Sequence, residues 1–220
     1  MGKIILFTNV KGGVGKTTLC SVFATYLSQN GRPVAVIDAD IQQSLYDHRQ
    51  LDLQNSPNAR LPWQIKALAG MPREEVAVAL EKLRGLSCDT VIDCPGNIID
   101  PNLGAIYSKA DIAVIPTHYC YDAMKATFKF AAMFKARFRA RMFFVPNNLS
   151  GIEESRSSIM ANREDAMEQL KPFGVLTARV KRSVVMAEYS TLLPLTPYQR
   201  NAVKYPFGPI VAELEKGGVD

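Results

Sequence analysis

The chain has 220 residues, of which 47% are hydrophobic and 21% charged, a composition ordinary for a soluble globular domain. Its longer apolar runs, such as 34–37 and 112–116, are far below the roughly 20 residues that a membrane-spanning helix needs. Lysine and arginine exceed aspartate and glutamate by 26 − 21 = 5, an excess too small to indicate a partner without the positions of the charges. The first apolar stretch, Ile4–Phe7, is too short for a secretory signal, so we expect one cytoplasmic domain over 1–220.

Short apolar runs alternate along the chain with segments of helical periodicity, which predicts a mostly parallel sheet covered by helices. The predicted strands are Lys3–Thr8, Pro33–Ile37, Thr90–Asp93, Ile112–Ile115, Met142–Val145 and Val175–Ala178, with a weaker edge strand at Gln64–Ala67. The predicted helices are Thr17–Gln29, Arg73–Leu83, Pro101–Ser108, Tyr121–Arg137, Glu153–Leu170 and Val203–Glu215. Ligands of such sheets bind beyond the carboxyl ends of the strands, so the residues there are the first candidates for a site.

A glycine-rich segment joins the first predicted strand to the first predicted helix. Glycines let backbone N–H groups turn toward an anion, and the start of the helix adds its positive end. In such a loop Lys16 reaches the β- and γ-phosphates of a nucleotide and the Thr17 hydroxyl ligates Mg²⁺. The segment therefore predicts a P-loop NTPase fold, a three-layer α/β/α arrangement around the sheet. The candidate nucleotide-binding residues are Lys11, Gly12, Gly13, Val14, Gly15, Lys16, Thr17 and Thr18.

The loop departs from the general P-loop pattern at its beginning. Val10 stands where that pattern has glycine, and a second lysine, Lys11, follows it. The run K-G-G-V-G-K-T-T is the deviant Walker A motif, so the sequence resembles the ParA/MinD family of ATPases. The resemblance implies that Lys11 crosses a dimer interface to the phosphates bound by the partner, in a dimer that forms with ATP.

Carboxylates follow two further strands. The segment Asp38-Ala39-Asp40-Ile41-Gln42 resembles the family's switch motif D-x-D-P-Q, with isoleucine in place of proline. The match implies that Asp40 positions the hydrolytic water and that Asp38 lies at the Mg²⁺ shell, although one of the pair could instead cap a helix over Gln42–Arg49. Asp93, in V-I-D-C-P-G, resembles the family's Walker B residue, which acts on Mg²⁺ through water. The expected catalytic residues are therefore Lys11, Lys16 and Asp40.

The base of the nucleotide is assigned from two features. Asn147 follows the strand Met142–Val145 at the place where family members contact the base, and we assign it to adenine. A contact from Asn148, or a turn role for both asparagines, remains an alternative. Neither N-K-x-D nor T-K-x-D, the usual elements of guanine recognition, occurs in the chain, so ATP is favoured.

The family contains several classes, and the sequence favours one of them. The acidic segment 210–220 is unlike a basic membrane-binding helix, and the four cysteines form no C-x-x-C pair. The first predicted strand begins at residue 3, so we expect no helix-turn-helix domain before it. These features indicate the short ParA class of DNA-segregation ATPases, which implies nonspecific DNA binding, nucleoid association with ATP, and a centromere-binding partner that stimulates hydrolysis. The alternative is an ATPase of the same fold in conjugative DNA transfer or in metabolism, such as a ligase resembling dethiobiotin synthetase.

Two groups of basic residues fit DNA binding, because they could neutralise backbone phosphates without reading sequence. A solvated helix face is the alternative explanation for the first group. The candidate DNA-binding residues are Lys135, Arg137, Arg139 and Arg141 in the first group, and Arg179, Lys181 and Arg182 in the second.

Overall fold

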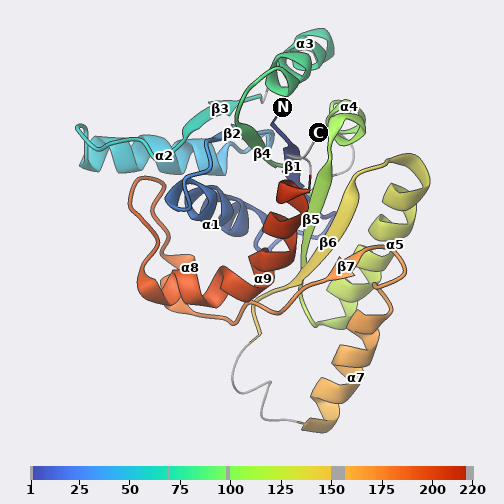
Figure 1. The fold of residues 1–220 in the computed structure, drawn as a ribbon. Coiled ribbons are helices and arrows are strands. Elements are labelled where there is room, and N and C mark those ends of the chain that lie inside the picture. The colour runs from blue at the N-terminus through green and yellow to red at the C-terminus, as the bar shows by residue number, and fades with distance from the viewer. Residues whose placement is uncertain (1, 69, 98–99, 150–156, 217–220) are drawn as a thin grey trace.

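A computed structural model describes the chain except residues 1, 69, 98–99, 150–156 and 217–220 (Figure 1). The strands are β1 (Ile4–Phe7), β2 (Val34–Asp38), β3 (Gln64–Ala67), β4 (Asp89–Asp93), β5 (Ile112–Thr117), β6 (Arg141–Pro146) and β7 (Val175–Leu176). The helices are α1 (Lys16–Gln29), α2 (Ser44–Asn55), α3 (Arg73–Arg84), α4 (Leu103–Lys109), α5 (Tyr121–Arg137), α7 (Ser157–Glu168), α8 (Val184–Ala187) and α9 (Pro197–Glu215).

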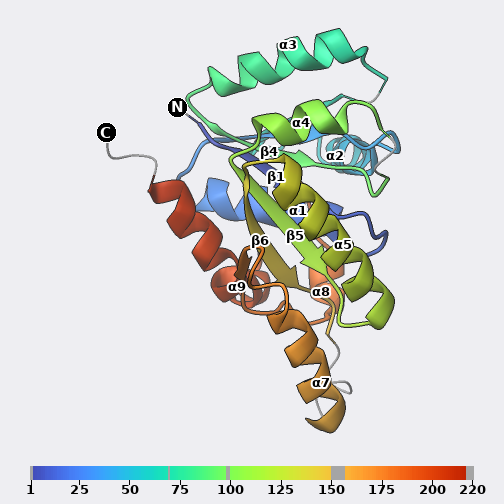
Figure 2. The same cartoon turned by 90° about the vertical axis from the view of Figure 1, so that its right-hand side faces the viewer.

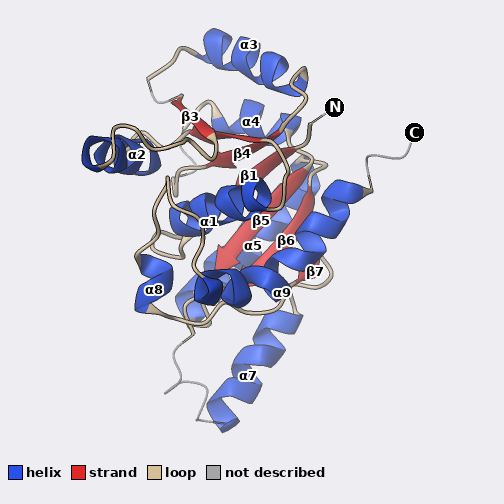
Figure 3. Ribbon diagram, turned by 60° about the vertical axis from the view of Figure 1, so that its left-hand side comes forward, coloured by secondary structure: helices blue, strands red, loops and turns tan. Residues whose placement is uncertain are grey.

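The seven strands form one sheet in the order β3-β2-β4-β1-β5-β6-β7, and every pairing within it is parallel. Side chains of β1 alternate between two apolar clusters, because successive residues of a strand point to opposite faces. One cluster includes side chains from α3, α4, α5 and α7, and the other includes side chains from α1, α2, α8 and α9. Figures 2 and 3 show how these two sets of helices are arranged around the sheet (Figure 2, Figure 3). The predicted three-layer α/β/α fold is thereby confirmed.

The register of the sheet brings the candidate residues to one edge. Asp38 ends β2 and is paired with Asp93, which ends β4, and Asp93 is also paired with Phe7 at the end of β1. Because the strands are parallel, their carboxyl ends and the loops that follow them converge beside the glycine-rich loop.

Several helices were missed or misplaced by the sequence analysis. Helix α2 was considered only as an alternative over Gln42–Arg49, and α8 was not predicted. Helix α9 begins at Pro197, six residues before the predicted start. Thr196 and Gln199 form a capping box there, which is a sequence signal for the start of a helix that the prediction did not use. Residues 153–156 of the predicted helix Glu153–Leu170 lie outside the described residues. No helix in the described part of the chain is long and apolar enough to cross a membrane.

Gly174 offers a test of the packing at the β7 edge. A Cβ at this position would lie 2.3 Å from the Met142 carbonyl oxygen, so Gly174→Ala must displace β7 from β6. We expect a loss of about 1–3 kcal/mol in the free energy of unfolding, measured by urea denaturation. Gly104→Ala is the matched control, because Gly104 is exposed within α4 and its added Cβ would meet nothing within 4 Å. The control should raise stability by about 0.5–1 kcal/mol, and equal effects of the two substitutions would contradict this packing.

Candidate nucleotide-binding site

The glycine-rich loop has the conformation of a phosphate cradle. Gly13 and Gly15 have φ of 72° and 92°, in the left-handed region that other residues rarely adopt, and Gly15 is the N-cap of α1. A Cβ at Gly12 or Gly13 would meet nothing within 4 Å, so this side of the loop faces open space. A Cβ at Gly15 would lie 2.3 Å from Nδ2 of Asn147, so this glycine is required by close packing as well as by φ.

The two lysines of the loop differ in their surroundings. Lys16 is only 8% exposed, and its Nζ lies 3.5 Å from the Lys11 carbonyl oxygen. A Cβ at Gly96 would come within 3.1 Å of the same Nζ, which places the Pro95-Gly96 segment directly against this lysine. Lys11 is half-buried, and its ammonium group has no hydrogen bond or ion pair with any residue that the structure describes. Lys16 is thus enclosed by the loop, whereas the Lys11 ammonium group has no partner among the described residues.

Asp93 is fully buried beneath the loop. The Thr17 hydroxyl donates a hydrogen bond to this carboxylate, yet its Oδ1 has no partner among the described residues. Burial raises the pKa of Asp93 to about 8, and the nearby charges of Asp38 and Asp40 act in the same direction. The Thr17 hydrogen bond and the Lys16 charge oppose this rise. A cation bound here would give this buried oxygen a partner and would offset the neighbouring negative charges.

Asp38 caps helix α2. Its Oδ2 accepts hydrogen bonds from the backbone N–H groups of Leu45 and Tyr46, both at 3.0 Å, and its Oδ1 accepts one from Asp40 at 3.1 Å. The capping alternative therefore applies to Asp38. Burial raises its pKa, and the three backbone hydrogen bonds oppose that rise.

Asp40 lies at the open end of this turn. Its Oδ1 accepts a hydrogen bond from Gln42 N at 3.0 Å, and the following Ile41 is 78% exposed. Gln43 has φ of 49° at the N-cap of α2, so the switch-like segment turns sharply into that helix. The geometry leaves Asp40 partly exposed beside the buried carboxylates.

These residues fit a nucleotide that brings its own metal ion. Among the described residues, no group of three or more His, Cys, Asp or Glu side chains could hold an ion without further ligands. The Thr17 hydroxyl and the unpartnered Asp93 oxygen therefore require phosphate oxygens to complete a Mg²⁺ site, which is the arrangement used by P-loop proteins. Thr17 and Asp93 are the residues that would hold the ion.

A cleft of about 180 Å³ opens beside the loop. Its wall opposite the loop is built by the end of β6 and by the segment 180–187, which contains α8. Asn147 lines it but donates its Nδ2 to the Val14 carbonyl oxygen at 2.9 Å, and Asn148 has φ of 62°. The lining residues are Gly13, Gly15, Thr18, Leu19, His118, Asn147, Asn148, Val180, Lys181, Arg182, Ser183, Met186 and Ala187.

Several of these lining residues were missed by the sequence analysis. His118 follows the carboxyl end of β5, so the strand-end rule could have identified it. Met186 and Ala187 lie on the short helix α8 and carry no motif. The assignment of adenine to Asn147 stays a prediction, and the bond to Val14 gives this side chain an additional role in fixing the loop.

The candidate DNA-binding residues do not form one cluster. Lys181 and Arg182 line the nucleotide cleft, and Arg179 pairs with Glu164 at 2.7 Å. The first group lies at the opposite end of the sheet, around the end of α5 and the start of β6. There Lys135 donates to the Pro172 carbonyl oxygen and Arg141 pairs with Glu213. The six residues of β6 separate the two groups by roughly 20 Å.

Residues 5–192 match the family described as the CobQ/CobB/MinD/ParA nucleotide binding domain. The chain belongs to this family. The septum site-determining protein MinD of Escherichia coli is 30% identical over 149 residues, which cover 54% of this chain and 53% of MinD. The chain therefore spans about half of the length of this relative. Protein virC1 of Rhizobium radiobacter is 25% identical over 207 residues, which cover 91% of this chain and 78% of that protein.

Solved structures of the family share the fold at low identity. Apo McdA of Cyanothece has a TM-score of 0.76 at 19% identity, covering 97% of this chain and 100% of McdA. A plasmid partition protein of Borrelia burgdorferi bound to AMPPNP has a TM-score of 0.72 at 18% identity, with 97% and 100% coverage. The pNOB8 ParA bound to nonspecific DNA has a TM-score of 0.63 at 15% identity, with full coverage of both chains. At these identities the likeness confirms the ParA/MinD fold and nothing finer.

The buried lysine of the loop provides the first test of the site. Lys16→Ala should weaken binding of Mg-ATP at least about thirtyfold, because a buried anion would lose its main cation, a loss of about 2 kcal/mol or more. Equilibrium titration by calorimetry measures this. Lys125→Ala, which removes an exposed lysine from α5, is the control and should bind as wild type does. Retained affinity in the Lys16 variant would show that the phosphates bind elsewhere.

Proposed function

We propose that this protein is a ParA-type DNA-segregation ATPase. It forms an ATP-dependent sandwich dimer, binds DNA nonspecifically, and hydrolyses ATP to position plasmid or chromosome cargo. The observation that carries the proposal is Lys11, whose ammonium has no hydrogen bond or ion pair within the described part of the chain while its loop opens to space. A charged lysine at the entrance of a phosphate loop is explained by a phosphate that a second subunit brings.

The residues divide the work of hydrolysis between them. The backbone N–H groups of the loop and the Lys16 ammonium bind and orient the phosphates, since the loop precedes the start of α1 and encloses Lys16. A Mg²⁺ ion held at Thr17 and Asp93 would neutralise charge on the phosphate oxygens. Asp40, partly exposed beside them, orients the attacking water, and Lys11 stabilises negative charge on the phosphates of the partner subunit.

The proposed partners follow from this dimer. Hydrolysis releases the subunits, so a centromere-binding protein that stimulates hydrolysis would control how long the dimer stays on DNA. In the cell the protein is expected in the cytoplasm, at the nucleoid when bound to ATP. McdA, the Borrelia partition protein and pNOB8 ParA share the fold over nearly the whole chain, so the fold is compatible with this assignment. Because a metabolic ligase of the same fold is equally compatible, the choice between the two rests on Lys11 and its test.

Asp40→Ala separates binding from hydrolysis. The variant should bind Mg-ATP with wild-type affinity, because the Asp40 side chain bonds only to Gln42 within its own turn among the described residues. Its turnover should fall at least about a hundredfold, since the attacking water loses its orienting group. Phosphate release and calorimetric affinity are measured on the same preparation. Wild-type turnover would move the water-positioning role to another residue.

Lys11→Ala separates binding from dimerisation. The monomer should retain ATP, because Lys16 and the loop are intact, but the dimer should be lost. Light scattering behind size exclusion, with and without a slowly hydrolysed ATP analogue, gives the mass of each species. Lys11→Arg preserves the charge and serves as the partial-rescue variant. A nucleotide-dependent dimer that survives in Lys11→Ala would remove the observation on which the proposed function rests.

DNA binding should require ATP and ignore sequence. Each neutralised phosphate contributes about −0.9 to the slope of log affinity against log salt, and a dimer doubles the contacts on one rigid body. Arg137→Glu with Arg139→Glu should make this slope less negative and weaken retention while leaving nucleotide binding unchanged, because both residues are exposed and far from the cleft. Charge reversal at Lys181 and Arg182 is less informative, because both residues line the nucleotide cleft and the change would also disturb nucleotide binding. Absence of ATP-dependent retention of random-sequence DNA by the wild type at low salt would contradict the partition function.

A further inference from the structure

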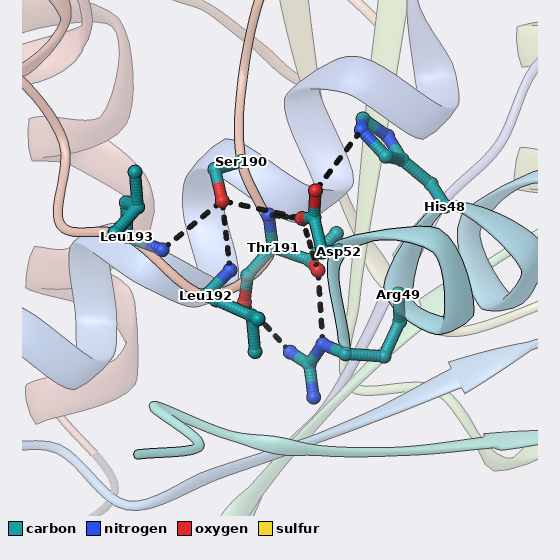
Figure 4. A network of polar contacts seen from close by, with 7 residues as sticks. All are labelled: His48, Arg49, Asp52, Ser190, Thr191, Leu192 and Leu193. Atoms are coloured by element: carbon teal, nitrogen blue, oxygen red, sulfur yellow. Dashed lines mark hydrogen bonds and ion pairs between the residues drawn. The ribbon is translucent and has the colours of Figure 1, made fainter. Parts of the chain in front are cut away.

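A buried polar network joins helix α2 to the segment Ser190–Leu193 (Figure 4). The Arg49 side chain, only 2% exposed, donates from Nε to Thr191 Oγ1 at 3.0 Å and from Nη2 to the Thr191 carbonyl oxygen at 2.8 Å. Asp52 Oδ2 accepts from the Thr191 backbone N–H and hydroxyl, both at 2.7 Å. Thr191 is fully buried, and its N–H, carbonyl and hydroxyl are all bound by one face of α2.

The Thr191 hydroxyl is the centre of this network. It accepts a hydrogen bond from Arg49 and at the same time donates one to Asp52, which a hydroxyl can do and a methyl group cannot. Ser190 extends the connection, since its Oγ lies 3.2 Å from Asp52 Oδ2 and accepts from the N–H groups of Leu192 and Leu193. The backbone of the segment is therefore fixed in one position relative to α2.

Arg49 makes this network costly. Its guanidinium has no carboxylate within ion-pair distance among the described residues, and burial lowers its pKa to about 10. It stacks over the Trp63 ring with Cζ 3.9 Å from the centroid, and its Nη1 donates to the Trp63 carbonyl oxygen at 2.8 Å. Buried polar groups of this kind add little stability compared with apolar side chains, but they fix one arrangement when all of them are satisfied. The main effect of this network is therefore to hold the neighbouring segment in one position and not to add stability.

The position that this network fixes is that of the cleft wall. Only residues 188–190 separate Thr191 from Ala187, and Ala187 and Met186 line the nucleotide cleft opposite the glycine-rich loop. Helix α8 is also bonded to α9, because Gln199 Nε2 of α9 donates to the carbonyl oxygen of Val185 in α8 at 2.7 Å. The wall is thus fixed by polar bonds on both sides, one set from α9 and the other from α2.

We propose that Arg49, Asp52 and Thr191 are positioning residues that set the distance between α8 and the glycine-rich loop, and thereby the affinity for the nucleoside part of the ligand. The inference rests on the proposed function, in which this cleft takes ATP. The triphosphate is bound by the loop, which the network does not touch, so the effect is confined to the nucleoside.

The test compares two ligands that differ only in the nucleoside. Binding of Mg-ATP and of inorganic tripolyphosphate with Mg²⁺ is measured by calorimetry for the wild type and for Thr191→Val, which preserves the shape and removes the hydroxyl. We expect ATP to bind at least about tenfold more weakly to the variant, and tripolyphosphate within about twofold of the wild type. Thr191→Ser, which retains the hydroxyl, should restore ATP binding. Arg49→Lys, which retains the charge but not the fork, should act as Thr191→Val does.

Two controls separate positioning from general loss of stability. Asp111→Asn alters the carboxylate that accepts from Ile4 N at the opposite end of the sheet, so it should leave the ratio of the two affinities unchanged. In the protein without ligand, amide hydrogens of 184–193 should exchange faster in Thr191→Val than in the wild type, a measurement that needs no nucleotide. If Thr191→Val does not fold, Arg49→Lys and Thr191→Ser provide the same comparison.

The outcomes distinguish this inference from the proposed function. An unchanged ratio of the ATP and tripolyphosphate affinities in the folded variants, or a parallel loss of both ligands, would overturn the positioning role. Absence of ATP binding by the wild type would instead overturn the proposed function, whatever the exchange of 184–193 shows.

Discussion

The pairing of two buried carboxylates governs this end of the molecule. Asp38 and Asp93 occupy paired positions on neighbouring parallel strands, and neither side chain reaches solvent. Two such groups destabilise one another unless each finds compensation. Asp38 finds it in three backbone N–H groups, and in doing so fixes the start of α2. Asp93 finds only part of it, from Thr17 and Lys16, so its pKa remains raised.

The incomplete compensation of Asp93 explains why this edge of the sheet suits a cation and phosphates together. Neither the carboxylates nor the loop makes a finished metal site within the described residues; the loop faces open space at Gly12 and Gly13 and encloses the buried Lys16. A nucleotide with its ion would supply a cation for the carboxylates and phosphates for the loop. The same pairing links the site to α2, because Asp38 and Asp40 belong to one turn, and α2 in turn fixes the segment that leads to α8.

The positions of the basic residues say more about this protein than its net charge does. The two groups of candidate DNA-binding residues lie at two ends of the sheet, and several of their basic side chains are engaged by acidic partners or carbonyl oxygens. Lys181 and Arg182 line the nucleotide cleft. Under the proposed function, their position beside the cleft gives a physical route by which nucleotide occupancy would alter a basic surface.

The sequence by itself determined the fold and the phosphate loop. Parallel strands buried on both faces and a glycine-rich turn before a helix are local patterns, and the backbone conformation of Gly13 and Gly15 follows from residue type. Only the tertiary structure decided that Asp38 caps α2, that Asn147 bonds to Val14, and that Arg49 and Thr191 meet. The last two contacts join residues that no local pattern relates, since Thr191 and Val14 lie more than a hundred positions from Arg49 and Asn147 along the chain. Such pairs become neighbours only when the sheet places its loops side by side.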